Sequence, residues 1–202
     1  MKAKSEILNA LTKQVRVLTS VQIARGWFDG NSRGASRTLT ALERGGFVWS
    51  VGMSLFADPD VTEPLFRWSA RECPEPEFNG LAYQLSVRQP AMKRGRIWTA
   101  TRKAFAEFGG QTRSVRRTDW EHDIAVSGIW MALRERLEAS GDSWILEDDL
   151  HQTEDFPDVA KPDAMIRQND GRIILIERGG RYSAETLRRK HESWSALTYW
   201  LY

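Results

Sequence analysis

The chain has 202 residues, of which 41% are hydrophobic and 28% are charged, a composition typical of a globular protein with one large domain or two small ones. Its single cysteine, Cys73, excludes a disulfide within the chain, and no apolar stretch reaches the roughly 18 residues of a membrane span. Because the amino terminus also lacks the apolar run of a signal peptide, we expect a cytoplasmic protein with no membrane partner.

The formal net charge of +2 is unevenly distributed along the chain. Residues 1–118 carry 19 Lys and Arg against 10 Asp and Glu, a net charge of +9, whereas residues 119–202 carry 10 against 17, a net charge of −7. The basic half is a candidate for binding a polyanion and the acidic half for binding a cation, although such a split can also lack a function.

The basic half begins with three predicted helices. Apolar residues at helical spacing predict the first over residues 4–17, and Thr19 or Ser20 can cap a second, which ends near residue 28. A turn rich in Gly and Asn then precedes the third helix, which ends at Gly45 and Gly46. The pattern next changes to that of strands, over 47–56 and 65–70, which we expect to form a β-hairpin.

Three short helices, a hairpin and the phrase LTALERGGF at residues 39–47 resemble a winged helix-turn-helix, which we assign to residues 1–70. In this fold the third helix usually enters the major groove of duplex DNA. The resemblance implies DNA contacts by the outward-facing side chains of that helix, whose chemistry suits phosphates and base edges: Arg33, Ser36, Arg37, Thr40 and Arg44. The alternatives are a solvated helix face or a winged helix that contacts protein.

Residues 71–117 are predicted to form a helical extension and a basic connector. Helices are expected over 79–89 and around 101–108, with a short strand at Ile97 and Trp98 between them. Three arginines of the connector could contact a phosphate backbone, or could simply keep a linker soluble: Arg113, Arg116 and Arg117.

The acidic half, residues 118–202, has the predicted order α-β-β-β-α-β. A helix over 118–142 is followed by strands over 143–150, 161–167 and 172–180, a helix over 183–197 and a short last element, with an acidic loop over 151–160. An NDG turn suits a hairpin between the second and third strands. Asp163 and Glu177 lie at the ends of these two strands, where carboxylates could bind a hard divalent cation or could be ordinary charges paired with Lys161 and Arg178.

This order of elements, with carboxylates in these places, resembles the restriction-endonuclease-like core of the PD-(D/E)xK nuclease superfamily. The resemblance implies that Asp163 and Glu177 bind Mg²⁺ or Mn²⁺, that Glu121 on the first helix assists as a third ligand, and that the metal promotes phosphodiester hydrolysis. Gly179 stands where the motif has its lysine, so Lys190 on the following helix is the candidate for that role. Arg181 is a second candidate.

A narrower resemblance joins both halves. The sequence PDA, then IILIE, and then LRRKHESW at residues 187–194, after a winged helix, is similar to the replication-relaxation proteins of plasmids and integrative elements. We therefore expect a two-domain α+β or α/β protein that binds double-stranded DNA and has metal-dependent nuclease activity or a derivative of it. The alternative is a non-catalytic regulator of transcription or replication, with a degenerate nuclease fold used for homodimerisation or partner binding.

Overall fold

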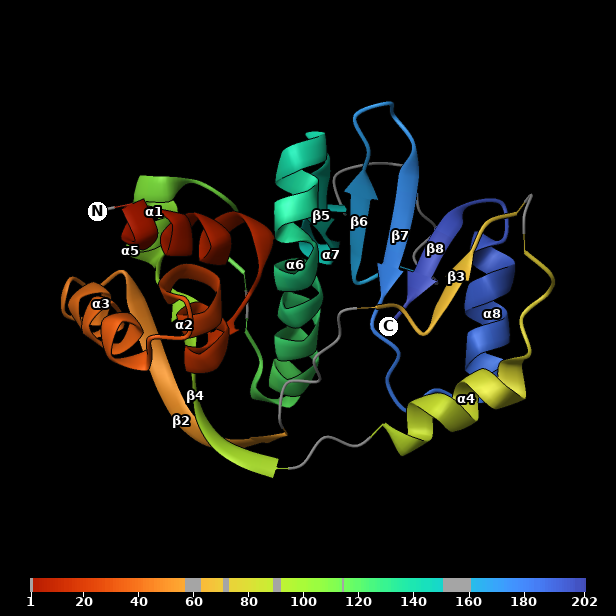
Figure 1. Cartoon of the computed structure of the whole chain (residues 1–202), viewed down its shortest axis with the longest axis horizontal. Coiled ribbons are helices and arrows are strands. Elements are labelled where there is room, and N and C mark those ends of the chain that lie inside the picture. Colours follow the sequence, from red (N-terminus) through yellow and green to blue (C-terminus); the bar gives the residue numbers. More distant parts are fainter. Residues whose placement is uncertain (1, 57–62, 71–72, 89–91, 114, 151–160) are drawn as a thin grey trace. The chain divides into compact units, whose positions relative to one another are not determined.

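The computed structural model describes residues 2–56, 63–70, 73–88, 92–113, 115–150 and 161–202 (Figure 1). These residues form eight α-helices, a three-stranded antiparallel sheet and a five-stranded mixed sheet, so the expected mixture of α and β structure is confirmed. The chain divides into two units. The first unit comprises residues 1–59 and 91–131, and the second comprises residues 60–90 and 132–202.

The helices of the first unit begin and end near the predicted positions. Thr19 caps α2 through a capping box with Gln22, and the side chain of Asn31 caps α3 by accepting a hydrogen bond from the Gly34 amide at 3.0 Å. The turn between α2 and α3 uses positive φ angles at Asp29 and Gly30. The helices are α1 (Lys2–Asn9), which continues into a π-helical turn (Ala10–Gln14), α2 (Ser20–Phe28), α3 (Ser32–Arg44) and α5 (Arg102–Phe108).

The sheet of the first unit corrects the predicted hairpin. Strand β2 (Val48–Phe56) pairs antiparallel with β4 (Met92–Ala100) along its whole length, and β1 (Leu18–Thr19) pairs with the other edge of β4. The expected partner, β3 (Phe66–Trp68), instead pairs with β8 (Thr198–Leu201) in the second unit. The nine residues of β4 pair with β2 over its full length, whereas the three residues of β3 could pair with only part of it. The prediction that the strands of residues 47–56 and 65–70 form a hairpin was therefore wrong.

Helix α6 (Trp120–Ser140) begins inside the core of the first unit, after a 3₁₀ turn at Arg117–Asp119. Trp120 and Ile124 pack against buried residues of β4 and of the segment before β1. The buried Asp123 carboxylate accepts a hydrogen bond from the Arg16 guanidinium at 3.0 Å. The sequence predicts one domain over residues 118–202, whereas the division between the units falls inside α6, because its first half buries its apolar face in the first unit.

The second unit confirms the predicted order α-β-β-β-α-β, with a four-residue helix added after the first strand. Its sheet has the order β3-β8-β7-β6-β5, in which β7 and β8 are parallel and the other pairs are antiparallel. The predicted acidic loop over 151–160 lies outside the described residues. The elements are β5 (Ser143–Leu146), α7 (Glu147–Leu150), β6 (Ala164–Arg167), β7 (Ile173–Glu177), α8 (Ala184–Trp194) and β8 (Thr198–Leu201).

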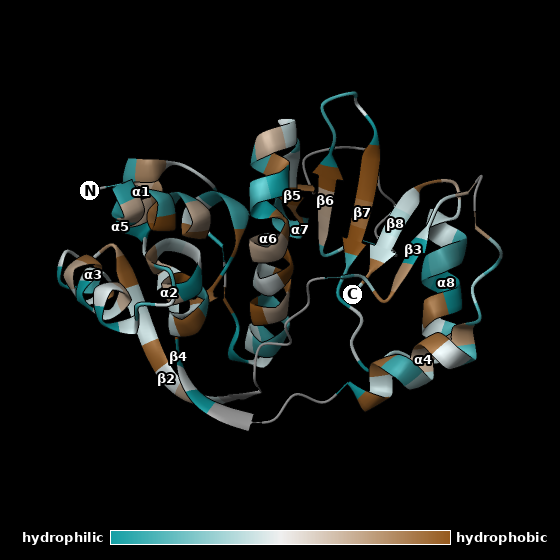
Figure 2. Ribbon diagram, in the orientation of Figure 1, coloured by the Kyte–Doolittle hydropathy of each residue, from teal (hydrophilic) through white to brown (hydrophobic). Residues whose placement is uncertain are grey.

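The segment between β2 and β4 supplies two elements to the second unit. These are β3, at the edge of its sheet, and α4 (Phe78–Val87), which packs on α8. Figure 2 shows that β6 and β7 are almost wholly apolar, in agreement with their burial. A cluster of aromatic and aliphatic side chains fills one side of the sheet: Trp68, Leu150, Met165, Leu175, Trp194 and Tyr199. Within the described part of the chain, no helix is long and apolar enough to cross a membrane.

Candidate functional site

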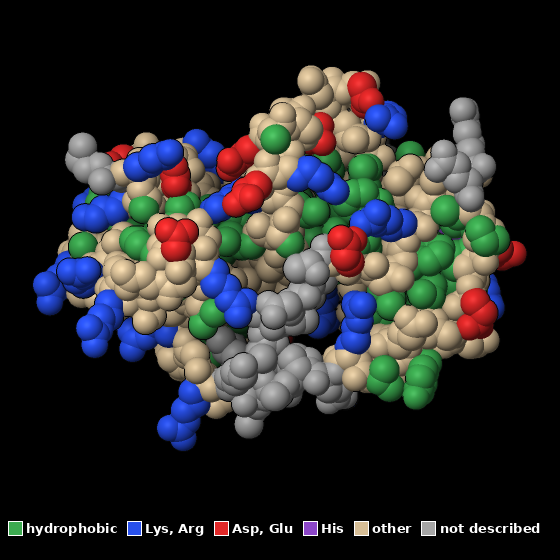
Figure 3. All heavy atoms as spheres, viewed as in Figure 1, with side chains coloured by type: hydrophobic (Ala, Val, Ile, Leu, Met, Phe, Trp, Pro, Cys, Tyr) green, Lys and Arg blue, Asp and Glu red, His purple; other side chains and the backbone are tan. Residues whose placement is uncertain are grey.

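Helix α3 of the first unit presents a row of arginines to solvent. Ala35, Leu39 and Leu42 are buried, and the row on the opposite side comprises Arg33, Arg37, Thr40 and Arg44, with Ser36 beside it. The three arginines and Ser36 are exposed, and Thr40 is half-buried. In Figure 3 blue side chains gather over α3. No acidic side chain of the described residues pairs with these arginines, so their charge is available to an external anion.

The β2–β4 pair adds two arginines that sequence reasoning missed. Arg94 and Arg96 are exposed on β4, and the register places them on the same sheet face as Ser50 and Ser54. That face adjoins α3, because the Ser50 hydroxyl donates to the Glu43 carboxylate of α3 at 2.7 Å and accepts a bond from Arg96 at 3.0 Å. Two arginines spaced two residues apart on a strand point to the same face, and this pattern could have indicated them. It was missed because the predicted hairpin paired β2 with β3 and not with β4.

The three arginines of the predicted connector differ in their surroundings. Arg116 and Arg117 are exposed, and their role as phosphate contacts stays a prediction. Arg113 is half-buried and donates to the backbone carbonyl of Lys13 at 3.2 Å. Its guanidinium therefore joins two segments of the first unit, and its phosphate contact also stays a prediction.

Asp163 and Glu177 of the second unit lie at the same end of the β6–β7 pair. The two strands are antiparallel, and Ala164 pairs with Ile176, so the residue before β6 adjoins the residue that ends β7. The Asp163 carboxylate accepts a hydrogen bond from the backbone amide of Arg178 at 2.6 Å. The sheet register thus brings together the two carboxylates that the sequence singled out.

Glu177 is 1% exposed, and two donors bind one of its carboxylate oxygens. The Lys190 ammonium lies 2.9 Å from Oε1, and the Tyr182 hydroxyl donates to the same oxygen at 2.7 Å. Oε2 is buried and has no hydrogen-bond partner among the described residues. Lys190 was predicted to approach this site, whereas nothing in the sequence pattern indicated Tyr182, which lies on the loop between β7 and α8.

The electrostatics of Glu177 follow from its burial. Loss of hydration, and then the charge of Asp163, raise the pKa of Glu177 to about 8, although Lys190 and Tyr182 oppose the shift. Burial and the neighbouring Glu177 also raise the pKa of Tyr182, so its hydroxyl keeps its proton and remains a donor. A buried carboxylate with one bare oxygen beside a second carboxylate is an arrangement that a cation would stabilise.

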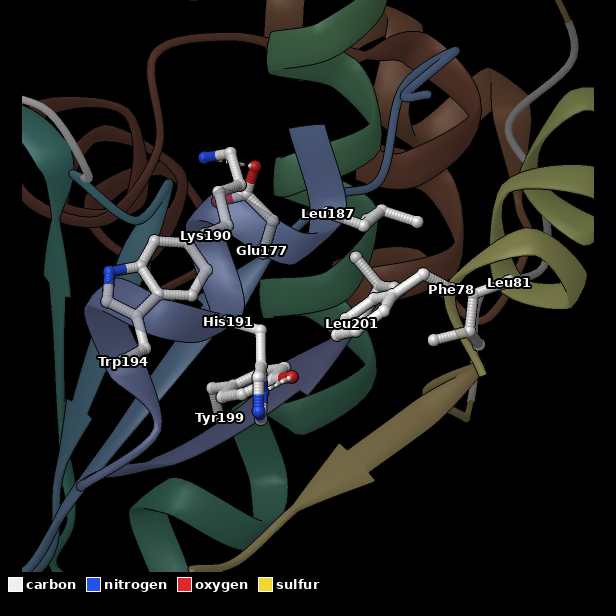
Figure 4. Close-up of a pocket in the computed structure, with 9 residues that line it drawn as sticks. All are labelled: Phe78, Leu81, Glu177, Leu187, Lys190, His191, Trp194, Tyr199 and Leu201. Atoms are coloured by element: carbon white, nitrogen blue, oxygen red, sulfur yellow. Dashed lines mark hydrogen bonds and ion pairs between the residues drawn. The ribbon is translucent and has the colours of Figure 1, made fainter. Parts of the chain in front are cut away.

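A small pocket lies on the α4 side of the Glu177–Lys190 pair (Figure 4). Its walls come from α4, α8, β7 and β8, and its volume of about 20 Å³ is room for one water molecule. In Figure 4, Phe78 and Leu81 of α4 face the pocket from one side, and Lys190 and Glu177 point toward each other on another. The pocket is thus too small for a nucleotide.

Helix α4 restricts the space at Gly179. A Cβ atom at Gly179 would lie 2.9 Å from Leu85 Cδ1 and 3.2 Å from Leu201 Cδ1, and closer still to Leu85 Cδ2. Leu85 of α4 occupies the space where a side chain at position 179 would begin. A side chain at position 179 would therefore require Leu85 or Leu201 to move.

The oxygens of Asp163 and Glu177 are of the kind that binds a divalent cation. Mg²⁺ in proteins is often held by one or two carboxylates with water and phosphate oxygens, so Asp163 and the bare Oε2 of Glu177 fit such an ion. Among the described residues, no group of three His, Cys, Asp or Glu side chains is assembled to hold a metal. Glu121 is exposed in the first unit, and its role as a third ligand stays a prediction.

Comparison of the chain with protein-family models, with curated proteins and with solved structures finds no match. Functional inference therefore depends on the residues themselves: the arginines of α3 and β4 in the first unit, and Asp163, Glu177, Tyr182 and Lys190 in the second.

Proposed function

We propose that the protein binds duplex DNA through its first unit, which acts as a winged helix-turn-helix with β2 and β4 as its wing. The observation that carries this proposal is the row of unpaired arginines on α3, next to the arginine-bearing face of β4. Helix α3 would contact the major groove, and Arg94 and Arg96 would contact the adjacent backbone. Each phosphate contact releases a counterion, so binding weakens as salt rises.

The test is a salt titration of binding to a labelled duplex, followed by fluorescence anisotropy. Replacing Arg33 and Arg37 together by alanine should lower affinity and reduce the slope of log K against log salt by about 2. A matched control removes two exposed charges from other helices of the same unit, Lys4 on α1 and Arg102 on α5. If both double variants bind alike, α3 is not the interface. If no duplex binds in a salt-dependent manner, the protein is instead a protein-interaction module.

A second candidate function is metal-dependent phosphodiester hydrolysis in the second unit, which we propose as a PD-(D/E)xK-like core. The observation that favours it is the Lys190 ammonium, 2.9 Å from Glu177, where the motif requires a cation. Asp163 and Glu177 would hold Mg²⁺ or Mn²⁺, which would supply Lewis-acid stabilisation and a more acidic water. Lys190 would stabilise the negative charge that develops on the phosphate.

Supercoiled plasmid incubated with Mn²⁺ tests this activity. Wild type should nick or linearise the plasmid, Asp163→Ala should not, and Glu185→Gln, which changes an exposed carboxylate of α8, should behave as wild type. If wild type and Asp163→Ala leave the plasmid equally intact, hydrolysis is excluded. DNA binding without cleavage would then identify a non-catalytic regulator that retains a degenerate nuclease fold.

A further inference from the structure

The two oxygens of the Glu177 carboxylate have unequal surroundings. Oε1 receives both the Tyr182 hydroxyl, at 2.7 Å, and the Lys190 ammonium, at 2.9 Å. Oε2, which is buried, has no partner within the described part of the chain. Leaving a buried acceptor unsatisfied costs on the order of 1–3 kcal/mol, and more for a charged group. An arrangement that places two donors on one oxygen and none on the other therefore points to an absent partner for the second oxygen.

Tyr182 is the more rigid of the two donors. Its ring packs against the cluster formed by α4, α8 and β8, and it directly precedes Ser183, the residue that caps α8 by accepting a bond from the Thr186 amide at 3.1 Å. A tyrosine has few rotatable bonds, whereas lysine is a flexible point charge on a four-carbon stem. The position of the Tyr182 hydroxyl is thus determined by the packing of its ring and by the helix cap that holds the adjacent backbone.

Lys190 also depends on neighbouring rings for its position. Its ammonium lies 5.5 Å from the Tyr182 ring and 4.7 Å from the Trp194 ring. Without the Tyr182 hydroxyl, Lys190 would remain as the only donor to the Glu177 side chain among the described residues. The carboxylate could then rotate about its last bond and offer either oxygen to the ammonium.

We infer that Tyr182 is a positioning residue: together with Lys190 it occupies Oε1 of Glu177, so that Oε2 is directed to a divalent cation shared with Asp163. This inference rests on the proposed hydrolytic site. The tyrosine contacts neither the cation nor the substrate. It acts by fixing the plane of a ligand, as hydrogen-bonded partners of metal ligands commonly do.

The experiment measures Mn²⁺ binding directly, from the amplitude of the electron paramagnetic resonance signal of free Mn²⁺, and needs no catalysis. Tyr182→Phe removes the hydroxyl and keeps the ring, and we expect it to weaken Mn²⁺ binding by about 10-fold to 100-fold. Tyr83→Phe is the matched control, because Tyr83 is 68% exposed on α4, and it should bind Mn²⁺ as wild type does. Thermal unfolding of both variants verifies that they remain folded at the temperature of measurement.

The possible outcomes distinguish a failure of the Tyr182 positioning role from a failure of the proposed hydrolytic site. Equal Mn²⁺ affinity in Tyr182→Phe and Tyr83→Phe would overturn the positioning role and leave the carboxylate site in place. No Mn²⁺ binding by wild type would overturn both the positioning role and the hydrolytic site. Binding of Mn²⁺ without plasmid cleavage would reject hydrolysis alone, and the salt-dependent binding of duplex by the first unit is measured independently.

Discussion

Gly179→Ala should destabilise the second unit although it adds a single methyl group. The backbone of Gly179 is outside the left-handed region, so an alanine fits its conformation and the cost is steric. The new Cβ would lie 2.9 Å from Leu85 Cδ1 and 3.2 Å from Leu201 Cδ1. Because carbon atoms pack at about 3.5–4.0 Å, the Leu85 side chain or α4 must withdraw by roughly 1 Å.

The magnitude follows from two opposing effects. Overpacking of a core costs about 1–3 kcal/mol, and replacing a glycine stabilises by about 0.4–1 kcal/mol through the unfolded chain, so we expect a net loss of about 1–2 kcal/mol. Leu85→Ala alone should cost about 2–5 kcal/mol, because Leu85 is 4% exposed in the α4–α8 cluster. In the double variant the methyl group occupies part of the vacated space, so its free energy of unfolding should exceed the additive value by about 1–2 kcal/mol.

Urea unfolding followed by tryptophan fluorescence measures all three variants. Gly180→Ala is the matched control, since a Cβ there would make an ordinary contact of 3.6 Å with Tyr182. The reasoning is refuted if Gly179→Ala is as stable as Gly180→Ala, or if the effects of Gly179→Ala and Leu85→Ala simply add. Either result would mean that Leu85 does not fill the space beside Gly179.

Three further predictions concern stability. Asn31→Ala removes the cap of α3 and should lower the free energy of unfolding by about 0.5–2 kcal/mol in urea, and an unchanged midpoint would contradict it. Asp123→Ala leaves the Arg16 guanidinium without this carboxylate and should lower the free energy of unfolding by about 3–5 kcal/mol. Replacing both Asp123 and Arg16 by apolar residues should recover most of that loss. Equal losses in the single and the double variant would contradict a role for this ion pair in stability. Because Glu177 has a raised pKa in the folded state, its contribution is fully present below its ordinary value of 4.5 and is lost as pH rises through about 8. The free energy of unfolding of wild type should therefore fall relative to that of Glu177→Gln as the pH rises between these two values. If urea unfolding gives the same difference between the two proteins at every pH, the prediction is refuted.

Local sequence patterns predicted individual elements well. The caps at Thr19 and Ser183, the glycines after α3 and the apolar run of β7 determine local structure through short-range hydrogen bonding and burial. The order of elements after residue 118 could also be predicted, since each strand and helix there has its own period. The candidate site was found in part, because Asp163 and Glu177 end strands that a short turn forces to be neighbours.

Pairing across long stretches of sequence could not be predicted. The chain inserts β3 and α4 between two strands that pair with each other, and the expectation that consecutive strands form a hairpin then gave the wrong partner for β2. The division between the units also falls inside α6, whose first residues bury Trp120 and Ile124 in the core of the first unit. Which strands pair, and against which core a helix packs, depends on the apolar surface buried and the backbone hydrogen bonds formed in the whole fold.

The sequence by itself determined which residues have useful chemistry: the arginines of α3, the two strand-end carboxylates and a lysine on α8. Only the tertiary structure decided how they are used. It placed Lys190 and Tyr182 on one oxygen of Glu177, left the other bare, and filled the space at Gly179 with Leu85 from a distant segment. The physical reason is that burial and hydrogen bonding act between residues that are close in space, whereas a sequence pattern records only residues that are close along the chain.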